Sequence, residues 1–553
     1  MRLPFRLFLL SLAVIELGAQ ERPVPRLAVI VTVDQMRADY LERFAPYFGD
    51  GGFKRLLTTG ADFQNCHYRH AVTKTAPGHA TIGSGVHADV HGIIGNEWLD
   101  RTSFLQGNAV EDAASPLVGL VRSLTRYPNA TMAAKAGRSP RNFLGVTVGD
   151  QLKARYGADA KVFGVADKDR SAILPVGRKA DGAYWTEEGL FVTSTFYRPE
   201  LPDWVKDFNG HHNAARHYGD IWDRLLPASV YEAVQGPDDA PGEEVSSGLS
   251  ATFPKRVASK SGRPDGEFYG AFDRTPWNNE MVAAMAQQLI GAERLGQDDI
   301  PDLLAVGFSQ PDSMGHAYGP DSHETFDSYL RLDRTLAAFF SFLDAQIGPG
   351  RWVVVLTADH GVARLPERVQ AETGSANAAG RIAARDLDIW VNQALDQAFG
   401  PLPEALFWTY RDNSSYHLNP RALAAKELSP DRVAAELSAA LVRHPMVGAA
   451  YTRSQLTMNG PLDAMGEMVR RSFNPARSAD VLFVEKYNFQ MRAAGTTHGT
   501  PHDYDTHVPQ VWFGAGVKPG VHPEPVAVED IAPTLAALLG VELPPEARGR
   551  RLF

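Results

Sequence analysis

The 553-residue chain has 44% hydrophobic and 22% charged residues, a composition typical of a globular protein and not of a disordered one. Its formal net charge of -10 and its lack of a basic tract argue against nucleic-acid binding, which needs clustered lysine and arginine. Cys66 is the only cysteine, so the chain forms no internal disulfide and no thiolate metal cluster. Any metal must therefore be held by histidine and carboxylate side chains.

The N-terminus has the pattern of a secretory signal peptide. Arg2 and Arg6 precede an apolar run from Leu7 to Ile15, and small residues follow. We therefore predict a signal peptide over residues 1–19 and a periplasmic or secreted mature protein. The apolar run is shorter than the about 20 residues that cross a bilayer, and no later segment is long and apolar enough, so we predict no membrane span.

Apolar, β-branched runs that end in polar residues recur along the chain and predict buried strands. Helical patterns lie between them, beginning for example at Asn278 and His323. This alternation predicts an α/β fold, a doubly wound and mostly parallel sheet with helices on both faces, in one domain over residues 20–553. The predicted strands are Leu27 to Gln35, Ala160 to Arg170, Asp302 to Asp312, Trp352 to Gly361 and Val508 to Gly516.

Two long stretches interrupt the alternation of strands and helices. Residues from about 180 to 270 are rich in aromatic residues, glycine and proline, and we expect an insertion there that caps the functional site, described below. Residues from about 365 to 485 contain helical patterns of their own, and we expect a second insertion there. An amphipathic helix is expected near the C-terminus, in "AVEDIAPTLAALLG".

Carboxylates and histidines follow several of the predicted strands. Each one alone is a common helix cap or turn residue. Their recurrence at separate strand ends instead favours a metal site, because imidazole and carboxylate together suit zinc. The candidate ligands are Asp34, Asp312, His316, Asp359, His360 and His498, with His502 and His507 as alternatives to His498. They are sufficient in number for two ions.

The stretch "TKTAPGHATIGSGV" offers three hydroxyls ahead of a predicted helix. Thr75 precedes Pro77, which is favoured in the first turn of a helix, so Thr75 is either a cap or a nucleophile. Helix N-termini attract phosphate, and a metal would make the threonine hydroxyl reactive. Thr81 is expected inside the helix, and Thr73 further from its start.

Asn96, Lys168 and Arg170 are the remaining polar candidates. Asn96 follows a glycine and is either a turn residue or a donor to a phosphate oxygen. Lys168 and Arg170, in "ADKDR" after a predicted strand, are either solvated charges or phosphate ligands.

Together these segments resemble the alkaline phosphatase superfamily, and more closely its phosphate-irrepressible, PafA-type branch. The resemblance runs in order through "VTVDQMRADY", "TKTAPGHATIGSG", "HGIIGNEW", "ADKDRSAI", "QPDSMGHAYGP", "TADHG", "THGTPHDYDTHVP" and "VEDIAPTLAALLG", and covers the core without the two insertions.

The resemblance implies two zinc ions per chain and a threonine nucleophile. The first zinc would be held by Asp312, His316 and His498; the second by Asp34, Asp359, His360 and the oxygen of Thr75. Thr75 would form a phospho-threonine, with Asn96, Lys168 and Arg170 on the phosphate oxygens. The branch has this lysine where other members use magnesium, so no obligatory Mg2+ is expected.

We therefore expect an exported, monomeric phosphomonoesterase of the alkaline phosphatase type (EC 3.1.3.1-like) that acts on small-molecule phosphate esters. The alternatives are a phosphodiesterase/nucleotide pyrophosphatase or a phosphonate hydrolase of the same superfamily. The Lys168 and Arg170 pair favours the monoesterase, because it matches a doubly charged phosphoryl group. A protein that only binds phosphate or zinc would not need the hydroxyl, and no C/S-x-P-S-R segment of a sulfatase is present.

Overall fold

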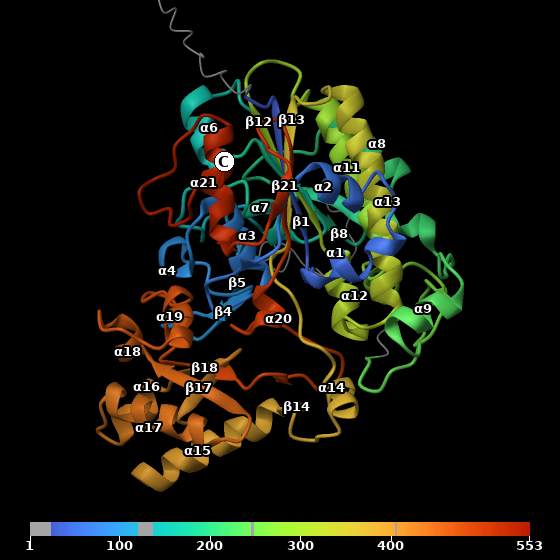
Figure 1. Ribbon diagram of the computed structural model, residues 1–553. Helices are drawn as coiled ribbons and strands as arrows, with labels where there is room; N and C mark the ends of the chain where they lie inside the picture. Colours follow the sequence, from blue (N-terminus) through green and yellow to red (C-terminus); the bar gives the residue numbers. More distant parts are fainter. Residues whose placement is uncertain (1–23, 120–136, 245–247, 404–405) are drawn as a thin grey trace, which may run out of the picture.

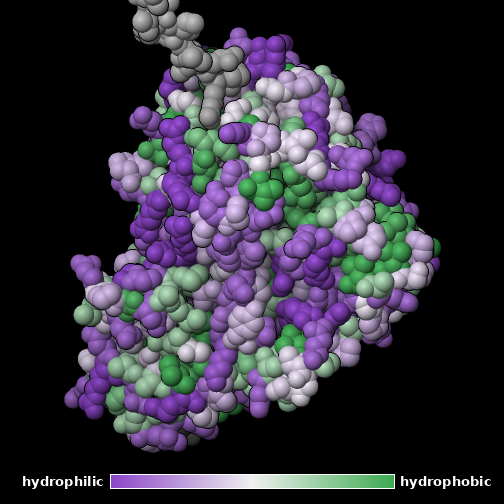
Figure 2. Space-filling model, in the orientation of Figure 1, coloured by the Kyte–Doolittle hydropathy of each residue, from purple (hydrophilic) through white to green (hydrophobic). Residues whose placement is uncertain are grey.

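The computed structural model describes residues 24–119, 137–244, 248–403 and 406–553 (Figure 1). The predicted signal peptide, residues 1–19, lies outside the described residues. Within the described ranges, no helix is both long and apolar enough to cross a bilayer. Hydrophilic residues cover most of the face shown in Figure 2, and hydrophobic residues form smaller separate areas on it.

A central ten-stranded sheet organises the chain. Its middle strands are parallel, and the seven residues of the innermost one are all buried, as expected when helices cover both faces. The strand order is β21 (Gly520–His522), β2 (Ala61–Phe63), β20 (Gln510–Gly514), β13 (Trp352–Thr357), β1 (Leu27–Val33), β12 (Asp302–Phe308), β7 (Val162–Ala166), β8 (Gly182–Glu187), β9 (Leu190–Ser194) and β6 (Leu117–Val118).

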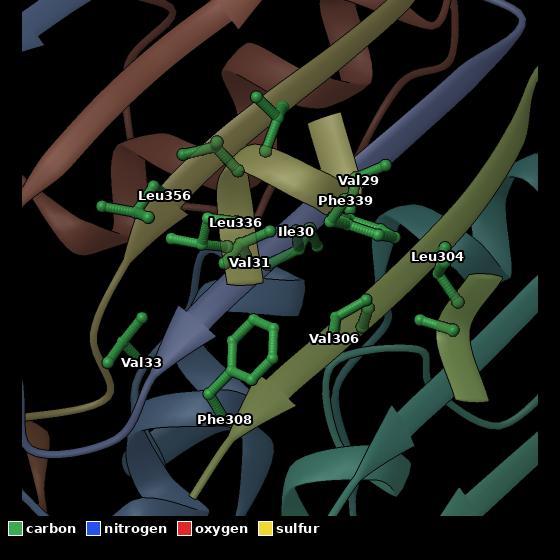
Figure 3. Packing of buried hydrophobic residues seen from close by; sticks show 14 of the residues in the cluster. Val29, Ile30, Val31, Val33, Leu304, Val306, Phe308, Leu336, Phe339 and Leu356 are labelled. Carbon is green, nitrogen blue, oxygen red and sulfur yellow. The ribbon is translucent and has the colours of Figure 1, made fainter. Parts of the chain in front are cut away.

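Helices lie on both sides of this sheet (Figure 1). In Figure 3, Leu336 and Phe339 of α13 gather with Val29 and Val31 of β1 in the buried core. One side carries α3 (Thr75–Ser84), α6 (Val148–Tyr156), α7 (Asp169–Ile173) and α21 (Ile531–Leu538). The other carries α2 (Phe53–Thr59), α8 (Asp203–His211), α11 (Pro276–Ala292), α12 (Gln310–Tyr318) and α13 (His323–Gln346).

The prediction of a doubly wound α/β fold with a mostly parallel sheet is confirmed. All five predicted strands are present, as β1, β7, β12, β13 and β20. Four of them are parallel to one another, whereas β20 runs antiparallel to β13. The predicted helices near Asn278, His323 and the C-terminus correspond to α11, α13 and α21.

The stretch expected as a cap, about 180 to 270, begins inside the central sheet. β8 and β9 pair there with each other, and β8 also pairs with β7, so their aromatic residues are buried in the core. After β9 the chain leaves the sheet through α8. It then forms η2 (Ala214–His217), β10 (Ile221–Trp222), α9 (Ala228–Gln235), β11 (Lys255–Arg256) and α10 (Gly266–Phe272).

The stretch from about 365 to 485 builds a separate small sheet with its own hydrophobic cluster, drawn in orange in Figure 1. The antiparallel strand order is β15 (Thr409–Asp412), β16 (Ser415–Leu418), β18 (Val481–Glu485) and β17 (Val447–Thr452). Its helices are α14 (Pro366–Thr373), α15 (Ala384–Phe399), α16 (Pro420–Ala425), α17 (Pro430–Arg443), α18 (Arg453–Thr457) and α19 (Ala464–Arg471).

Short elements complete the described part of the chain. They are α1 (Asp39–Arg43), η1 (Ala45–Tyr47), β3 (Cys66–His67), α4 (Ala88–His91), β4 (Glu97–Leu99), β5 (Gln106–Asn108), β14 (Gly380–Arg381), β19 (Phe489–Gln490), α20 (Asp503–Thr506), β22 (Val526–Ala527) and η3 (Val528–Asp530).

Candidate metal centre and active site

The carboxyl ends of the parallel strands bring the predicted ligands together. Asp34 directly follows β1, and its backbone N–H donates to the carbonyl of Phe308 at the end of β12. Asp359 and His360 follow β13, the other neighbour of β1. Because parallel strands end at the same edge of a sheet, these side chains share one site.

One group of candidate ligands consists of Asp312, His316 and His498, whose donor atoms all lie within 4.8 Å of one another. Asp312 and His316 are four residues apart on α12 and therefore project from the same helix face. Oδ1 of Asp312 lies 3.2 Å from Nε2 of His316 and 3.5 Å from Nε2 of His498.

A second group consists of Asp34, Asp312 and His360, again within 4.8 Å of one another. Nε2 of His360 lies 3.4 Å from Oδ1 of Asp34 and 3.5 Å from Oδ2 of Asp359. Asp312 thus belongs to both groups, and the two sets of ligands adjoin.

The three histidines are oriented by backbone carbonyls. Nδ1 of His316 lies 2.8 Å from the carbonyl oxygen of Thr496, Nδ1 of His360 lies 2.9 Å from that of Gly361, and Nδ1 of His498 lies 2.8 Å from that of Thr73. A carbonyl oxygen accepts a hydrogen bond only from a donor N–H, so Nδ1 of each ring carries a hydrogen. Each Nε2 then faces the carboxylates, as in histidines that bind metals.

Unpartnered atoms show that these residues fit a metal. Oδ1 of Asp34, Oδ2 of Asp359 and Nε2 of His360 are buried and have no hydrogen-bond partner among the described residues. Burial and the neighbouring Asp359 raise the pKa of Asp34 well above its usual value, and burial raises the pKa of Asp359 to about 6. Buried acids without enough positive charge are costly, and a cation removes that cost.

His360 is ready to donate its lone pair, because burial lowers its pKa to about 3 and keeps the ring neutral. At Asp312 burial raises the pKa, but His316 and Lys168 outweigh it and hold the pKa well below its usual value. A set of imidazoles and carboxylates, without thiolates, is the donor chemistry of zinc and similar ions.

Lys168 lies among these carboxylates. Its Nζ donates to Oδ2 of Asp34 at 2.7 Å and to Oδ2 of Asp312 at 2.5 Å. Burial opposes its charge, but Asp312 and Asp34 together raise the pKa of Lys168 above its usual value. The structure thus brings Lys168 to both ligand groups as a fixed positive charge, rather than leaving it in solvent.

Thr75 is the first residue of α3, and the cap position belongs to Lys74. The interpretation of Thr75 as a helix cap is therefore wrong, because Thr75 lies inside the helix and its hydroxyl makes no hydrogen bond to a described residue. Its Oγ1 is buried without a hydrogen-bond partner among the described residues. By contrast, the hydroxyl of Thr73 donates to the carbonyl of Thr500 at 2.8 Å, and that of Thr81 lies 3.4 Å from Nε2 of His91.

Gly78 explains how α3 comes so close to the end of β13. A β-carbon at this position would overlap the carbonyl oxygen of Asp359. Asn96 supports the same helix end, since its Oδ1 accepts a hydrogen bond from the N–H of Ala76 at 2.8 Å. This bond leaves the Asn96 amide nitrogen as the group that can donate to a ligand.

Arg170 stands at the start of α7, close to Lys168. Its guanidinium lies 3.7 Å from Asp169, and its Nε is buried without a hydrogen-bond partner in the described ranges. The alternative ligands His502 and His507 lie outside the two groups. Nε2 of His502 contacts the carbonyl of Glu485, and Nε2 of His507 contacts that of Gln64.

Three residues of the site were not singled out from the sequence. Gln35 has φ 66°, donates from its backbone to Asp359 and donates from its side chain to Asp312 at 2.7 Å. His79 lies 3.7 Å from Oδ2 of Asp359. Lys74 donates to Asn413 at 2.6 Å, in the turn between β15 and β16. The sequence could have indicated Gln35 and Lys74 only because they are adjacent to the candidate residues Asp34 and Thr75.

Comparison with known proteins agrees with this geometry. Residues 28–505 match the family described as type I phosphodiesterase / nucleotide pyrophosphatase. The chain is 35% identical to alkaline phosphatase PafA of Elizabethkingia meningoseptica over 97% of this chain and 95% of that protein. It is 33% identical to alkaline phosphatase PhoV of Synechococcus elongatus over 95% of this chain and 92% of that protein.

The crystal structure of wild-type alkaline phosphatase PafA superimposes with a TM-score of 0.87, at 33% identity, over 96% of this chain and 98% of that one. The fold, the order of the sequence segments and these similarities agree. The chain therefore belongs to the type I phosphodiesterase / nucleotide pyrophosphatase family and, within the alkaline phosphatase superfamily, to its PafA-type branch.

Proposed function

We propose that the chain is an exported, zinc-dependent phosphomonoesterase that hydrolyses phosphate monoesters to inorganic phosphate through a phospho-threonine intermediate. The observation that carries the proposal is a set of buried, unpartnered atoms at one edge of the sheet. They are Oγ1 of Thr75, Oδ1 of Asp34, Oδ2 of Asp359 and Nε2 of His360. A hydroxyl left unbonded beside unpaired metal ligands favours catalysis over storage or structural support.

Two zinc ions fit the ligand groups. Asp312, His316 and His498 would hold the first, and Asp34, Asp359, His360 and the oxygen of Thr75 would hold the second. Bound zinc would supply positive charge that makes the threonine hydroxyl more acidic and stabilises the departing oxygen. Each histidine would bind through Nε2, because Nδ1 is engaged with a backbone carbonyl.

The chain's own residues perform the transfer. Oγ1 of Thr75 attacks phosphorus and loses its proton, the ester P–O bond breaks, and the alcohol leaves with a proton from solvent. A water molecule then attacks the phospho-threonine, its P–O bond to Thr75 breaks, and inorganic phosphate leaves while Thr75 regains a proton. The amide nitrogen of Asn96 and the charges of Lys168 and Arg170 hold the non-bridging oxygens through both steps.

The charges near the site favour a monoester over a diester. A monoester dianion carries two negative charges on its phosphoryl group, whereas a diester carries one. Lys168 and Arg170 therefore gain more from the monoester. The family also takes its description from phosphodiesterases and nucleotide pyrophosphatases. A diesterase, or a phosphonate hydrolase, is accordingly the alternative to be tested.

Lys168 also bears on the metal content. Its ammonium pairs with both Asp34 and Asp312 and offsets one of their two negative charges. We therefore propose that no magnesium ion is required beside the two zincs. We propose further that residues 20–553 form a monomeric catalytic domain with two insertions, released to the periplasm or the medium after removal of residues 1–19.

The test compares an aryl phosphate monoester with its methyl diester, using wild type, Thr75→Ala and Lys168→Ala/Arg170→Ala protein, with metal content measured on each sample. We expect wild type to prefer the monoester, Thr75→Ala to lose turnover while it keeps its fold, and the double variant to lose that preference. Full monoesterase activity of Thr75→Ala would rule out the nucleophile. A wild type that prefers the diester would support the alternative.

A further inference from the structure

Gln35 is a buried residue in a backbone conformation that only glycine adopts readily. It directly follows Asp34 and is 3% exposed. Its φ of 66° lies in the left-handed region, where the β-carbon of an ordinary residue is crowded. Seven described residues other than glycine have a positive φ, and Gln35 is the only buried one among them. Such strain persists where surrounding contacts maintain it, so the contacts of Gln35 indicate its role.

The backbone of Gln35 contacts Asp359, which follows the neighbouring strand β13. Its N–H donates a hydrogen bond to Oδ1 of Asp359 at 3.2 Å. The other oxygen, Oδ2, has no hydrogen-bond partner among the described residues and lies 3.5 Å from Nε2 of His360. The backbone of Gln35 therefore holds one oxygen of Asp359 and leaves the other free to bind a metal together with His360.

The side chain of Gln35 contacts a different carboxylate, Asp312. Its Nε2 donates to Oδ1 of Asp312 at 2.7 Å. The same oxygen lies 3.2 Å from Nε2 of His316 and 3.5 Å from Nε2 of His498. The other oxygen, Oδ2, accepts from Nζ of Lys168 at 2.5 Å. The amide and the ammonium thus hold the Asp312 carboxylate at both oxygens, with Oδ1 facing the two histidines.

Helix α12 leaves room for the Gln35 amide at Gly315. A β-carbon at this position would overlap Oε1 of Gln35. Glycine inside a helix is less stable than alanine, because it loses more backbone freedom on folding. The missing side chain at Gly315 is therefore explained by the close approach of Gln35, one residue before the candidate ligand His316.

Asp312 needs such a partner because its position alone does not decide which ion it binds. It belongs to both groups of candidate ligands, and in each group the donor atoms lie within 4.8 Å of one another. Residues that hydrogen-bond to a metal ligand orient it and contribute to metal affinity. The Gln35 amide contacts the one oxygen of Asp312 that faces His316 and His498.

We propose that Gln35 is a positioning residue of the metal centre: its side chain commits Asp312 to the first zinc, and its backbone orients Asp359 for the second. The inference rests on the two zinc sites of the proposed function and adds the residue that distributes the ligands between them. Because only the side chain contacts Asp312, replacing it should weaken the first site and spare the second.

The test uses Gln35→Met, which keeps the length of the side chain and removes the donor. His360→Ala protein retains the ligands of the first site, and His316→Ala protein those of the second. Metal-free full chain is titrated with zinc against a chelating indicator. We expect Gln35→Met to weaken zinc binding about 10- to 100-fold in the His360→Ala background and not to weaken it in the other. Equal losses in both backgrounds, or no loss in either, would overturn the proposal. Gln288→Met, at an exposed position of α11, is the control.

Gly315→Ala tests the same contact from the other side. In the His360→Ala background its methyl group should displace the Gln35 amide and weaken zinc binding as Gln35→Met does. In protein that also carries Gln35→Ala there is no amide left to displace, so Gly315→Ala should cause no further loss. Additive losses would mean that the methyl group acts on His316 instead, and would overturn the proposal. Gly291→Ala is the control, since nothing lies near a β-carbon there.

Cobalt(II) in place of zinc separates positioning from a merely structural role, because its visible absorption depends on ligand geometry. In the His360→Ala background, Gln35→Met should shift these bands, while the melting temperature of the metal-free protein stays the same. A lower melting temperature with an unchanged spectrum and unchanged zinc affinity would overturn the proposal. Wild type that binds two zincs, with both affinities kept in Gln35→Met, would overturn it and leave the proposed function intact. Wild type that binds no zinc would contradict both.

Discussion

Nζ of Lys168 lies 2.7 Å from Oδ2 of Asp34, the residue directly after the central strand β1. The same nitrogen contacts Asp312, which belongs to both groups of candidate ligands. The chain therefore places one positive charge among its candidate metal-binding carboxylates. Lys168 therefore bears both on the preference for a monoester over a diester and on whether a magnesium ion is needed beside the two proposed zincs.

Replacing Lys168 by methionine should lower kcat/KM for an aryl monoester by about 10² to 10³, the usual effect of removing one fixed charge that stabilises a transition state. The loss for the methyl diester should be smaller, because its phosphoryl group carries less charge. Steady-state rates with both esters measure this, with zinc content determined for each sample. Lys179→Met, at an exposed lysine that precedes the start of β8 and lies away from the site, is the control. An equal loss for both esters would contradict a role on the phosphoryl charge.

Removal of metal should destabilise the fold as well as stop turnover. Asp34, Asp312 and Asp359 are buried together, and each would lose a compensating charge on removal of the proposed zinc ions. We expect dialysis against a chelator to lower the melting temperature and abolish monoester hydrolysis, and zinc alone to restore both. Elemental analysis should find two zincs per chain in the restored protein. Restoration that needed magnesium in addition would contradict the role assigned to Lys168.

Much of the fold and the candidate ligands could be predicted because both are local in the sequence. Buried parallel strands are continuous apolar runs, and a ligand such as Asp34 stands directly after one. β8 and β9 were not predicted as strands, because aromatic residues and glycine are as typical of a loop as of a sheet.

Contacts between distant segments could not be predicted in this way. Gln35 reaches Asp312 across 277 positions of the chain, and Lys74 reaches Asn413 across 339. Neither residue type indicates a site by itself. A cavity beside Arg170 is a similar case, because its walls meet only through the sheet topology.

Gly78→Ala should disable the site without unfolding the protein. The added methyl group would overlap the carbonyl of Asp359 and push the start of α3, with Thr75, away from the end of β13. We expect at least a 10²-fold loss of kcat, as for other small misplacements of catalytic groups, with unchanged far-UV circular dichroism. Gly210→Ala is the matched control, since nothing lies near a β-carbon at that helical position. Normal activity of Gly78→Ala would show that this close approach is dispensable.

Stability at alkaline pH should depend on Glu243. Burial, with a contribution from Glu324, raises its pKa to about 9, and its Oε2 is buried without a hydrogen-bond partner among the described residues. Between the ordinary carboxyl pKa and pH 9 the folded chain therefore binds more protons at this site than the unfolded chain does. The free energy of unfolding must then fall as pH rises through this interval.

Glu243→Gln removes this proton uptake, because glutamine stays neutral at every pH. We expect the melting temperature of the variant, relative to wild type, to increase steadily from pH 5 to pH 9 and to level off above the folded-state pKa. Thermal melts in matched buffers at constant ionic strength measure the difference, with Glu244→Gln as the neighbouring control because Glu244 pairs with Arg492. A difference that shrank with rising pH would contradict the sign of the shift, because the folded chain would then bind fewer protons at Glu243 than the unfolded one.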